Sequence, residues 1–440
     1  MREVLVKNEE FKDSPLGKIP KDWDVNPLST LGEIVTGTTP PSYVLGVWGD
    51  TLPFITPGEI SEDGQILNVE RSLSPIGINY VRTVPSQAVL VVCIGSTLGK
   101  TALSKEECAT NQQINAVIPN SIHDSRFIYA ALTYQIDQLL RCAGLQAVPI
   151  VNKQQFGKML IPIAPPNIQR IIAEILDTVD EAIARTSSLI IKLKQTKAGL
   201  LQDLLTRGLD NDGKLRDPQA HPEQFKDSPL GIIPKNWEVF SVGDCILKIE
   251  QGWSPDCESF TTPLGEWGVL KTTSVVWEGY QDSENKRLPS HLEPDPNYEV
   301  KPRDVLMTRA GPNSRVGVVA LVSQTQGKLM LSDKLYRLVP RELIKPDFLV
   351  YTLSGSQTQS HLSTLKTGLA ESQTNISQEI VRSLLFILPS RKEQANIISI
   401  LDSHDTRIRA EEAYLNKLKL QKQGLMQDLL TGKVRVRTIK

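Results

Sequence analysis

The sequence predicts an α+β chain in which two domains, each a mixed β-sheet with helices, are held apart by two long antiparallel coiled-coil helices. Three observations lead to this prediction: the chain is long, it repeats itself around two unlike segments, and two apolar stripes run through helix-forming sequence. Its 440 residues suffice for roughly two to four domains with a buried core in each. Because of the duplication, we expect the halves to be related by a pseudo-two-fold axis.

Composition and charge exclude several classes of protein. The 49 Lys and Arg balance 50 Asp and Glu, and 40% of the residues are hydrophobic, which excludes a wholly disordered chain and a uniformly basic nucleic-acid coat. No apolar run approaches the ~18–20 residues that span a bilayer, and the start, Met1 to Val4, lacks the apolar core of a signal peptide. The five cysteines have no Cys-x-x-Cys spacing. We therefore expect a cytoplasmic protein with reduced thiols and without a zinc site.

Two internal repeats frame the chain. Residues 11–25 return as residues 225–239 with 12 of 15 positions identical, and residues 169–206 return as residues 394–431 with 18 of 38 identical. The segments between them, 26–150 and 240–375, align only in fragments. Two similar frames with unlike middles are what a reader of two different targets requires. The alternative is an old duplication whose middle segments drifted without consequence.

The second repeat predicts a long helix with a coiled-coil seam, because its apolar residues recur at spacings of three and four. A helix of 38 residues is ~57 Å long, which is longer than one domain is wide. We therefore expect the two copies to pair, antiparallel, with the unlike segments at opposite ends. The expected seam residues are Leu176, Ile183, Ile190, Leu193, Leu200 and Leu204 in the first helix, and Leu401, Ile408, Leu415, Leu418, Leu425 and Leu429 in the second.

The repeats and the turn signals also predict where segments begin and end. Asn152 and Ser377 are expected to cap short helices, and prolines such as Pro389 to separate each unlike segment from its long helix. We expect the basic tail from Lys433 onward to be solvated. The expected segments are a first domain at 1–165, a long helix at 166–208, a linker at 209–224, a second domain at 225–390 and a second long helix at 391–440.

Motifs for catalysis are missing from the sequence. A phosphate loop is nearly present at Gly95 to Thr101, but the P-loop pattern has four residues between its glycines and this loop has three. The five histidines lack the spacing of metal ligands, and there is no nucleophile elbow. We therefore expect a chain with no catalytic residues, no metal and no cofactor of its own.

The two unlike segments instead contain side chains typical of DNA recognition. Each has a glycine loop near its start, a second glycine loop further on, and then a polar triplet. Amide and guanidinium groups of this kind pair with base edges in a major groove. The candidate DNA-binding residues are Thr38, Thr39, Ser42, Tyr43, Ser96, Lys100, Asn111, Gln112 and Gln113 in the first segment, and Trp253, Ser254, Lys271, Arg309, Asn313, Arg315 and Lys334 in the second.

A set of motifs occurs in a fixed order along the chain: Ile-Pro-Lys-x-Trp at 19–23 and 233–237, the loop 36–42, the runs 53–60, 95–100, 111–114 and 374–377, and the helix endings Gly-Leu-x-Gln-Asp-Leu-Leu-Thr. Through these motifs and over essentially its whole length, the chain resembles the specificity subunits of type I restriction-modification systems. The opening loop of the second segment departs from the common pattern, with Gly252-Trp-Ser-Pro255 where the first segment has Gly-Thr-Thr-Pro.

The resemblance implies two target recognition domains, each reading one half of a split, asymmetric double-stranded DNA sequence, with the helices setting the unread spacer. It also implies two methyltransferase (modification) subunits docked on the helices and two ATP-dependent restriction subunits in a larger complex. S-adenosylmethionine and ATP would belong to those partners. Because the net charge of −1 offers little phosphate neutralisation, we expect weak DNA binding by the chain alone.

Two alternatives from other classes stay open at this point. One is a fused restriction and methylation enzyme, which would bind S-adenosylmethionine itself. The other is a rod-like adaptor between proteins that does not bind DNA, and its loss would leave genomic methylation unchanged.

Overall fold

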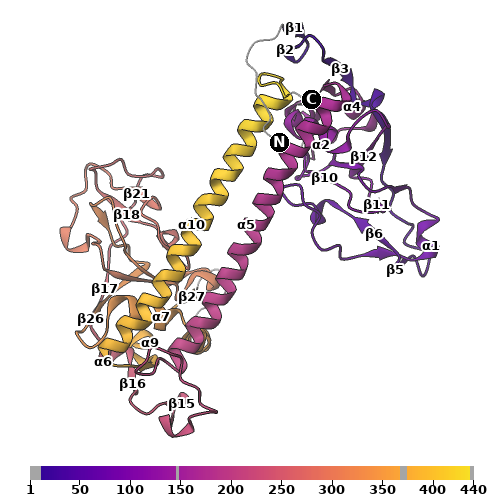
Figure 1. Ribbon diagram of the computed structural model, residues 1–440. Helices are drawn as coiled ribbons and strands as arrows, with labels where there is room; N and C mark the ends of the chain where they lie inside the picture. The colour runs from indigo at the N-terminus through magenta and orange to yellow at the C-terminus, as the bar shows by residue number, and fades with distance from the viewer. Residues whose placement is uncertain (1–10, 145–147, 367–373, 437–440) are drawn as a thin grey trace. The chain divides into compact units, whose positions relative to one another are not determined.

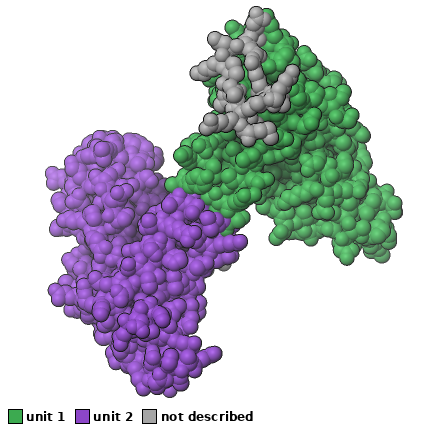
Figure 2. Space-filling view, viewed as in Figure 1, with its two compact units in different colours: residues 1–188, 412–440 green, residues 189–411 purple. Residues whose placement is uncertain are grey.

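The computed structural model describes residues 11–144, 148–366 and 374–436. The chain forms two compact units: unit 1 comprises residues 1–188 and 412–440, and unit 2 comprises residues 189–411 (Figure 2). Each long helix is divided between the two units. The units therefore do not correspond to the segments expected from the sequence, and the boundaries of those segments remain predictions. The residues expected to lack a signal peptide, Met1 to Val4, and the last four residues of the basic tail lie outside the described ranges.

Unit 1 is built from short strands, short helices and parts of two long helices (Figure 1). Its strands are β1 (Phe11–Ser14), β2 (Gly17–Pro20), β3 (Asp24–Pro27), β4 (Gly32–Thr36), β5 (Trp48–Gly49), β6 (Leu52–Ile55), β7 (Ser72–Leu73), β8 (Thr83–Val84), β9 (Val89–Val92), β10 (Thr101–Leu103), β11 (Cys108–Thr110), β12 (Ile114–Pro119) and β13 (Leu160–Ile163). Its helices are α1 (Pro75–Ile78), α2 (Ser125–Tyr134), α3 (Ile136–Ala143), α4 (Lys153–Gly157) and the first part of α5 (Pro166–Thr206), together with the last part of α10 (Arg391–Leu430).

An antiparallel sheet in the order β10-β9-β12-β4 lies between two cores of unit 1. Strand β9 is the apolar run Val89-Leu-Val-Val92, and all four of its side chains are buried. Because successive side chains of a strand point to opposite faces, Val89 and Val91 pack into the core around Trp23 and Phe127, whereas Leu90 and Val92 pack into a second core. The second core also receives a mixed sheet in the order β5-β7-β6-β11-β8, through Ile55 and its neighbours.

Unit 2 repeats this plan with a different sequence (Figure 1). Its strands are β14 (Phe225–Ser228), β15 (Gly231–Pro234), β16 (Glu238–Ser241), β17 (Ile246–Gln251), β18 (Gly268–Leu270), β19 (Val275–Val276), β20 (Gly279–Tyr280), β21 (Asn285–Arg287), β22 (Val305–Thr308), β23 (Ala310–Gly311), β24 (Val319–Leu321), β25 (Leu329–Met330), β26 (Leu335–Pro340), β27 (Thr374–Asn375) and β28 (Leu385–Leu388). Its helices are α6 (Val242–Cys245), α7 (Pro346–Ser354), α8 (Ser356–Leu365), α9 (Gln378–Ser383) and the remaining parts of α5 and α10.

The central sheet of unit 2 has the order β17-β26-β22-β24, which matches β4-β12-β9-β10 of unit 1 strand for strand. Strand β22 again serves two cores, because Val305 and Met307 join the core around Trp237 while Leu306 joins another. The predicted caps are confirmed: the side chains of Asn152 and Ser377 accept hydrogen bonds from the first turns of α4 and α9.

The predicted α+β class with a pair of long antiparallel helices is confirmed. In unit 1, Asp180 of α5 lies 2.6 Å from Lys422 of α10, and in unit 2, Asp405 of α10 lies 2.5 Å from Lys197 of α5. The repeat places Asp405 at the position of Asp180 and Lys422 at the position of Lys197, so the same ion pair forms twice.

Some of the expected seam residues pack into the main cores of the two units, and the others are buried or partly buried outside those cores. Leu176 and Leu429 join the main core of unit 1, with Leu425 packed against it, and Leu204 and Leu401 join that of unit 2, with Leu200 packed against it. The remaining members are buried outside these cores, except for Leu415, which is partly buried. These remaining buried residues are Ile183, Ile190, Leu193, Ile408 and Leu418.

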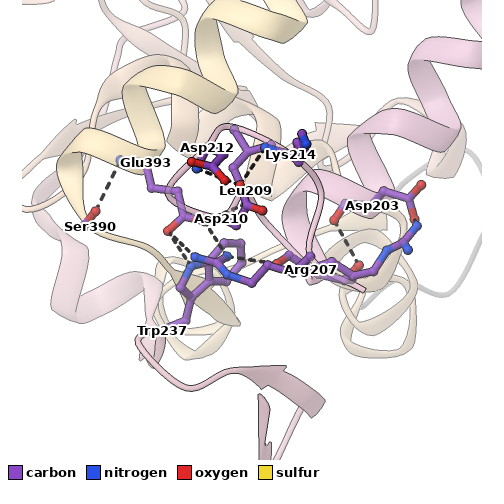
Figure 3. Close-up of polar contacts among 11 residues, drawn as sticks. Asp203, Arg207, Leu209, Asp210, Asp212, Lys214, Trp237, Ser390 and Glu393 are labelled. Carbon is purple, nitrogen blue, oxygen red and sulfur yellow. Dashed lines mark hydrogen bonds and ion pairs between the residues drawn. The ribbon is translucent and has the colours of Figure 1, made fainter. Parts of the chain in front are cut away.

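The end of α5 is held in unit 2 by a buried polar cluster around Glu393 (Figure 3). The Glu393 carboxylate accepts hydrogen bonds from the Leu209 backbone N–H at 2.8 Å, from Arg216 Nη1 at 2.7 Å and from Trp237 Nε1 at 3.0 Å. Gly208 has φ of +62° and lies against the Trp237 ring, where a Cβ atom would meet a ring carbon at 2.2 Å. This position therefore admits only glycine.

The corresponding helix end in unit 1, that of α10, is held differently. Gly432, at the end of α10, lies against Pro20 and Trp23, and the Trp23 Nε1 atom is buried without a hydrogen-bond partner in the described chain. The expectation of a solvated tail is wrong as far as residue 436, because Val436 is buried in the main core of unit 1 and Arg435 donates two hydrogen bonds to the Asp22 carboxylate, at 2.7 and 2.6 Å.

Candidate nucleic-acid interface

Three loops of unit 1 meet at one end of its central sheet, where β4 ends, β12 begins and β9 turns into β10. The first loop is fixed by its backbone: Gly37 N–H donates to the Ile114 carbonyl at 3.0 Å, and Thr38 N–H donates to the Thr110 carbonyl at 2.8 Å. A Cβ atom on Gly37 would lie 2.1 Å from the Asn111 carbonyl oxygen. The glycine thus allows the first loop to lie directly against the polar triplet 111–113.

The side chains of these loops form a hydrogen-bonded cluster on the surface of unit 1. Thr39 Oγ1 donates to Gln112 Oε1 at 2.6 Å, and both residues are exposed. Arg82, just before β8, donates to Thr38 Oγ1 from Nε at 2.9 Å and from Nη2 at 2.7 Å. We call Thr38, Thr39, Arg82 and Gln112 the unit 1 cluster. Arg82 was not predicted from the sequence, because it lies on neither glycine loop and has no motif around it.

Other candidates from the first segment use their polar groups inside the unit. Asn111 Nδ2 donates to Gln113 Oε1 at 2.9 Å, and Gln113 Nε2 donates to the Ile94 carbonyl at 3.4 Å. Lys100 Nζ lies 3.1 Å from the Glu62 carboxylate and donates to the Ile60 carbonyl at 3.0 Å. These three side chains brace the loops. Ser42, Tyr43 and Ser96 are exposed.

The same three loops meet at the same end of the central sheet in unit 2. Gly252 N–H donates to the Ser332 carbonyl at 3.3 Å and Trp253 N–H to the Leu331 carbonyl at 3.1 Å. A Cβ atom on Gly252 would lie 1.7 Å from the Leu331 carbonyl oxygen, so this glycine again permits close backbone packing. Ser254 Oγ donates to Asp333 Oδ1 at 2.5 Å, which places the Ser254–Asp333 pair where unit 1 has Thr39–Gln112.

Two basic residues adjoin the Ser254–Asp333 pair, since Lys334 follows Asp333 in the chain and Arg309 contacts the Asp333 backbone. Arg309 N–H donates to the Lys334 carbonyl at 3.0 Å, its Nη1 donates to the Asp333 carbonyl at 3.3 Å, and its guanidinium lies 5.6 Å from the centre of the Tyr336 ring. Lys334 and Arg315 are exposed. We call Ser254, Arg309, Arg315, Asp333 and Lys334 the unit 2 cluster.

The remaining candidates of unit 2 are Trp253, Asn313 and Lys271. Trp253 and Asn313 are exposed, and Lys366 Nζ donates to the Asn313 carbonyl at 3.0 Å. Burial lowers the pKa of Lys366 below its ordinary value. Lys271 follows β18 and lies 3.8 Å from the Glu284 carboxylate, which offsets its charge. Asp333 belongs to the polar triplet 332–334 seen in the sequence but was not among the candidate DNA-binding residues, and Lys366 was not singled out.

The two clusters present groups suited to polar recognition. Their hydroxyl, amide, carboxylate, ammonium and guanidinium groups donate or accept hydrogen bonds at the surface of each unit. Within the described ranges, no group of three His, Cys, Asp or Glu side chains is placed to hold a metal ion. None of the described helices combines the length and the apolar character that a membrane span needs.

Comparison with known proteins identifies relatives of the chain. The "Type I restriction enzyme EcoEI specificity subunit" of Escherichia coli is 38% identical over 218 residues, which is 49% of this chain and 35% of that relative. The "Type I restriction enzyme MjaVIII specificity subunit" of Methanocaldococcus jannaschii is 24% identical over 98% of both chains. The chain thus spans about a third of the first relative and nearly all of the second.

Solved structures share the fold. A crystal structure of the type I restriction-modification system S subunit from M. genitalium matches 95% of this chain and 97% of that chain, with a TM-score of 0.56 and 14% identity. A structure described as the basis of complex assembly and conformational transition of the type I R-M system matches 94% of this chain and 99% of that chain, with a TM-score of 0.55 and 17% identity.

The family model described as "Type I restriction modification DNA specificity domain" matches the chain twice, at residues 20–195 and 234–420. The resemblance seen in the sequence is confirmed, and so is the expectation that the chain is not itself an enzyme, because the relatives are named as specificity subunits. With each copy of the repeat matched separately, the chain belongs to the family of type I restriction-modification DNA specificity proteins.

Proposed function

We propose that this chain reads a split, asymmetric sequence in double-stranded DNA, with the unit 1 cluster reading one half and the unit 2 cluster reading the other. The observation that supports this most is the equivalence of the two clusters. Thr39–Gln112 and Ser254–Asp333 join the same two loops at the same end of matching sheets, with different side chains. A duplicated scaffold with altered contact residues is suited to two different half-sites.

The charges of the clusters fit contact with a duplex. Arg82 in unit 1, and Arg309, Arg315 and Lys334 in unit 2, provide cations at surfaces of a chain whose net charge is only −1. Cations gathered on the reading surfaces bind phosphate more strongly than the same charges spread evenly. We expect the isolated chain to bind DNA weakly and the assembled complex to bind it tightly.

We further propose that the long helices set the length of the unread spacer and that two modification subunits dock on them. Two restriction subunits would join the larger complex. The repeated ion pairs Asp180–Lys422 and Asp405–Lys197 support a stiff helix pair with two equivalent faces, which suits two copies of one partner. S-adenosylmethionine and ATP would be bound by those partners and not by this chain.

Genomic methylation tests the proposal directly. The chain is produced with its modification subunits in a host that lacks adenine methylation, and the modified sites are read by long-read sequencing. We expect one bipartite motif, which disappears when this chain is omitted. If the modification subunits alone methylate the same motif, or if the chain adds no motif while still joining the complex, the proposal is wrong and an adaptor role is favoured.

Double substitutions within each cluster locate the reading surfaces. Thr39→Ala with Gln112→Ala should abolish recognition through unit 1, and Ser254→Ala with Lys334→Ala should weaken recognition through unit 2. Lys158→Ala is a matched control, because Lys158 is exposed and lies away from the three loops. The next residue, Met159, accepts a hydrogen bond from the Leu28 N–H, which precedes β4, whereas the loops meet where β4 ends. Retention of full methylation by both double variants would exclude these clusters as the reading surfaces.

A further inference from the structure

Asp333 is a carboxylate among the basic residues of the unit 2 cluster. Its Oδ1 accepts the Ser254 hydroxyl at 2.5 Å, and its own N–H donates back to Ser254 Oγ at 3.1 Å. Arg309 contacts the backbone carbonyl of Asp333, and no cation of the described chain forms an ion pair with its side chain. One carboxylate oxygen, Oδ2, is therefore left with accepting capacity at a partly exposed position.

The equivalent residue of unit 1 has the opposite hydrogen-bonding character. Thr39 donates to Gln112 Oε1, which leaves the two N–H groups of the Gln112 amide as donors at an exposed position. Ser254 donates to Asp333 in the same way, but the remaining atom of an ionised carboxylate can only accept. The two clusters thus present a donor and an acceptor at matching places.

An acceptor with a full negative charge fits only one kind of group on DNA. It is repelled by phosphate, and the acceptors of guanine and thymine in the major groove offer it no proton. The donors there are the exocyclic amino groups, N4 of cytosine and N6 of adenine. Arg309 and Lys334, which adjoin Asp333, carry positive charges that would offset the repulsion between its carboxylate and the phosphates.

We propose that Asp333 is a specificity-determining residue that accepts a hydrogen bond from the exocyclic amino group of a cytosine or an adenine in the half-site read by unit 2. This inference rests on the proposed function. It adds that, in one contact, the protein is the hydrogen-bond acceptor and the base is the donor. Every base pair carries one such amino group, on adenine or on cytosine, so the inference requires that one position of the half-site read by unit 2 be specified as a single base pair. The base found there identifies which amino group is bound.

Asp333→Asn tests the inference, because asparagine keeps the size and one oxygen for the Ser254 hydroxyl but presents N–H donors in place of the second oxygen. Asp333→Glu keeps the acceptor. Asp227→Asn is the charge control, since Asp227 is exposed on β14, outside the central sheet. Each variant is produced with the modification subunits, its assembly is checked by co-purification, and its methylation motif is sequenced.

For Asp333→Asn we expect methylation of the original motif to fall roughly 10- to 100-fold, with base preference altered at one position of one half-site and unchanged elsewhere. Asp333→Glu should retain the original base at that position, and Asp227→Asn should match the parent. An unchanged motif in an assembled Asp333→Asn complex would overturn the inference alone. So would a uniform gain in methylation, which would reduce Asp333 to a charge that repels phosphate. If the parent chain gives no bipartite motif, the proposed function itself fails.

Discussion

Replacing Glu393 by alanine should destabilise unit 2 while leaving unit 1 intact. The Glu393 and Arg216 side chains are each only 9% exposed, and the carboxylate accepts from Arg216, Trp237 and the Leu209 backbone (Figure 3). Removing one partner of such a buried pair costs about 3–5 kcal/mol, because the other charge stays buried without compensation. Arg216→Ala should cost a similar amount, and the double variant less than the sum of the two.

Hydrogen exchange followed by mass spectrometry measures this loss locally, which suits a chain of two units that need not unfold together. For Glu393→Ala, peptides covering 204–216 and 391–401 should exchange more than about a hundredfold faster, as a drop of 3–5 kcal/mol implies. Peptides of unit 1 should be unchanged, and Glu342→Ala, at an exposed position, should match the parent. A change below about tenfold, or an equal change in both units, would show that the Glu393 cluster does not stabilise unit 2 in this way.

Three further predictions follow from burial, charge and backbone packing. Iodoacetamide should label the exposed Cys142 in the folded protein at pH 8. It should not label three buried thiols until urea is added, because burial raises their pKa to about 11 or 12. Those thiols are Cys93, Cys108 and Cys245. Peptide mass spectrometry would detect the labelled sites. The hydrogen bond from Arg435 lowers the pKa of Asp22 below its ordinary value of 3.8. Residues 429–436 should therefore be better protected from hydrogen exchange in the parent than in Asp22→Asn, with the full difference at pH 7 and its loss as the pH falls through the lowered pKa. Equal protection of the two proteins at pH 7 would contradict this. Gly37→Ala and Gly252→Ala should each abolish motif methylation, since their Cβ atoms would lie 2.1 and 1.7 Å from carbonyl oxygens, and parental methylation in either variant would show that the loops need not pack so closely.

The architecture could be predicted because the duplication and the periodicity of apolar residues are both visible in the sequence, without knowledge of which segments meet in three dimensions. The seam of α5 and α10 follows from the spacing of residues such as Leu176 and Leu401, and the caps at Asn152 and Ser377 follow from side-chain chemistry. The sequence could not show that the ends of the seam pack into the domain cores, because this depends on which surfaces meet in three dimensions.

The candidate site was predictable only in part. Glycine loops and polar triplets located the loops that meet, but the contacts within them depend on strand pairing between distant segments. Arg82 lies 44 residues from Thr38 in the chain, and Asp333 lies 79 residues from Ser254. Lys100 and Gln113 looked like readers from residue type alone, yet their polar groups bond within unit 1. Val436 lies in a basic tail that we expected to be solvated, but it is buried in the main core of unit 1.

One exchange experiment tests the central claim that each unit reads its own half-site. Residues 26–150 are replaced by the corresponding segment of a relative with a different motif, and the methylation motif of the assembled complex is sequenced. We expect one half-site to take the sequence read by the donor, while the other half-site and the spacer length stay as in the parent. A change in both half-sites, or an altered spacer with both half-sites kept, would contradict it.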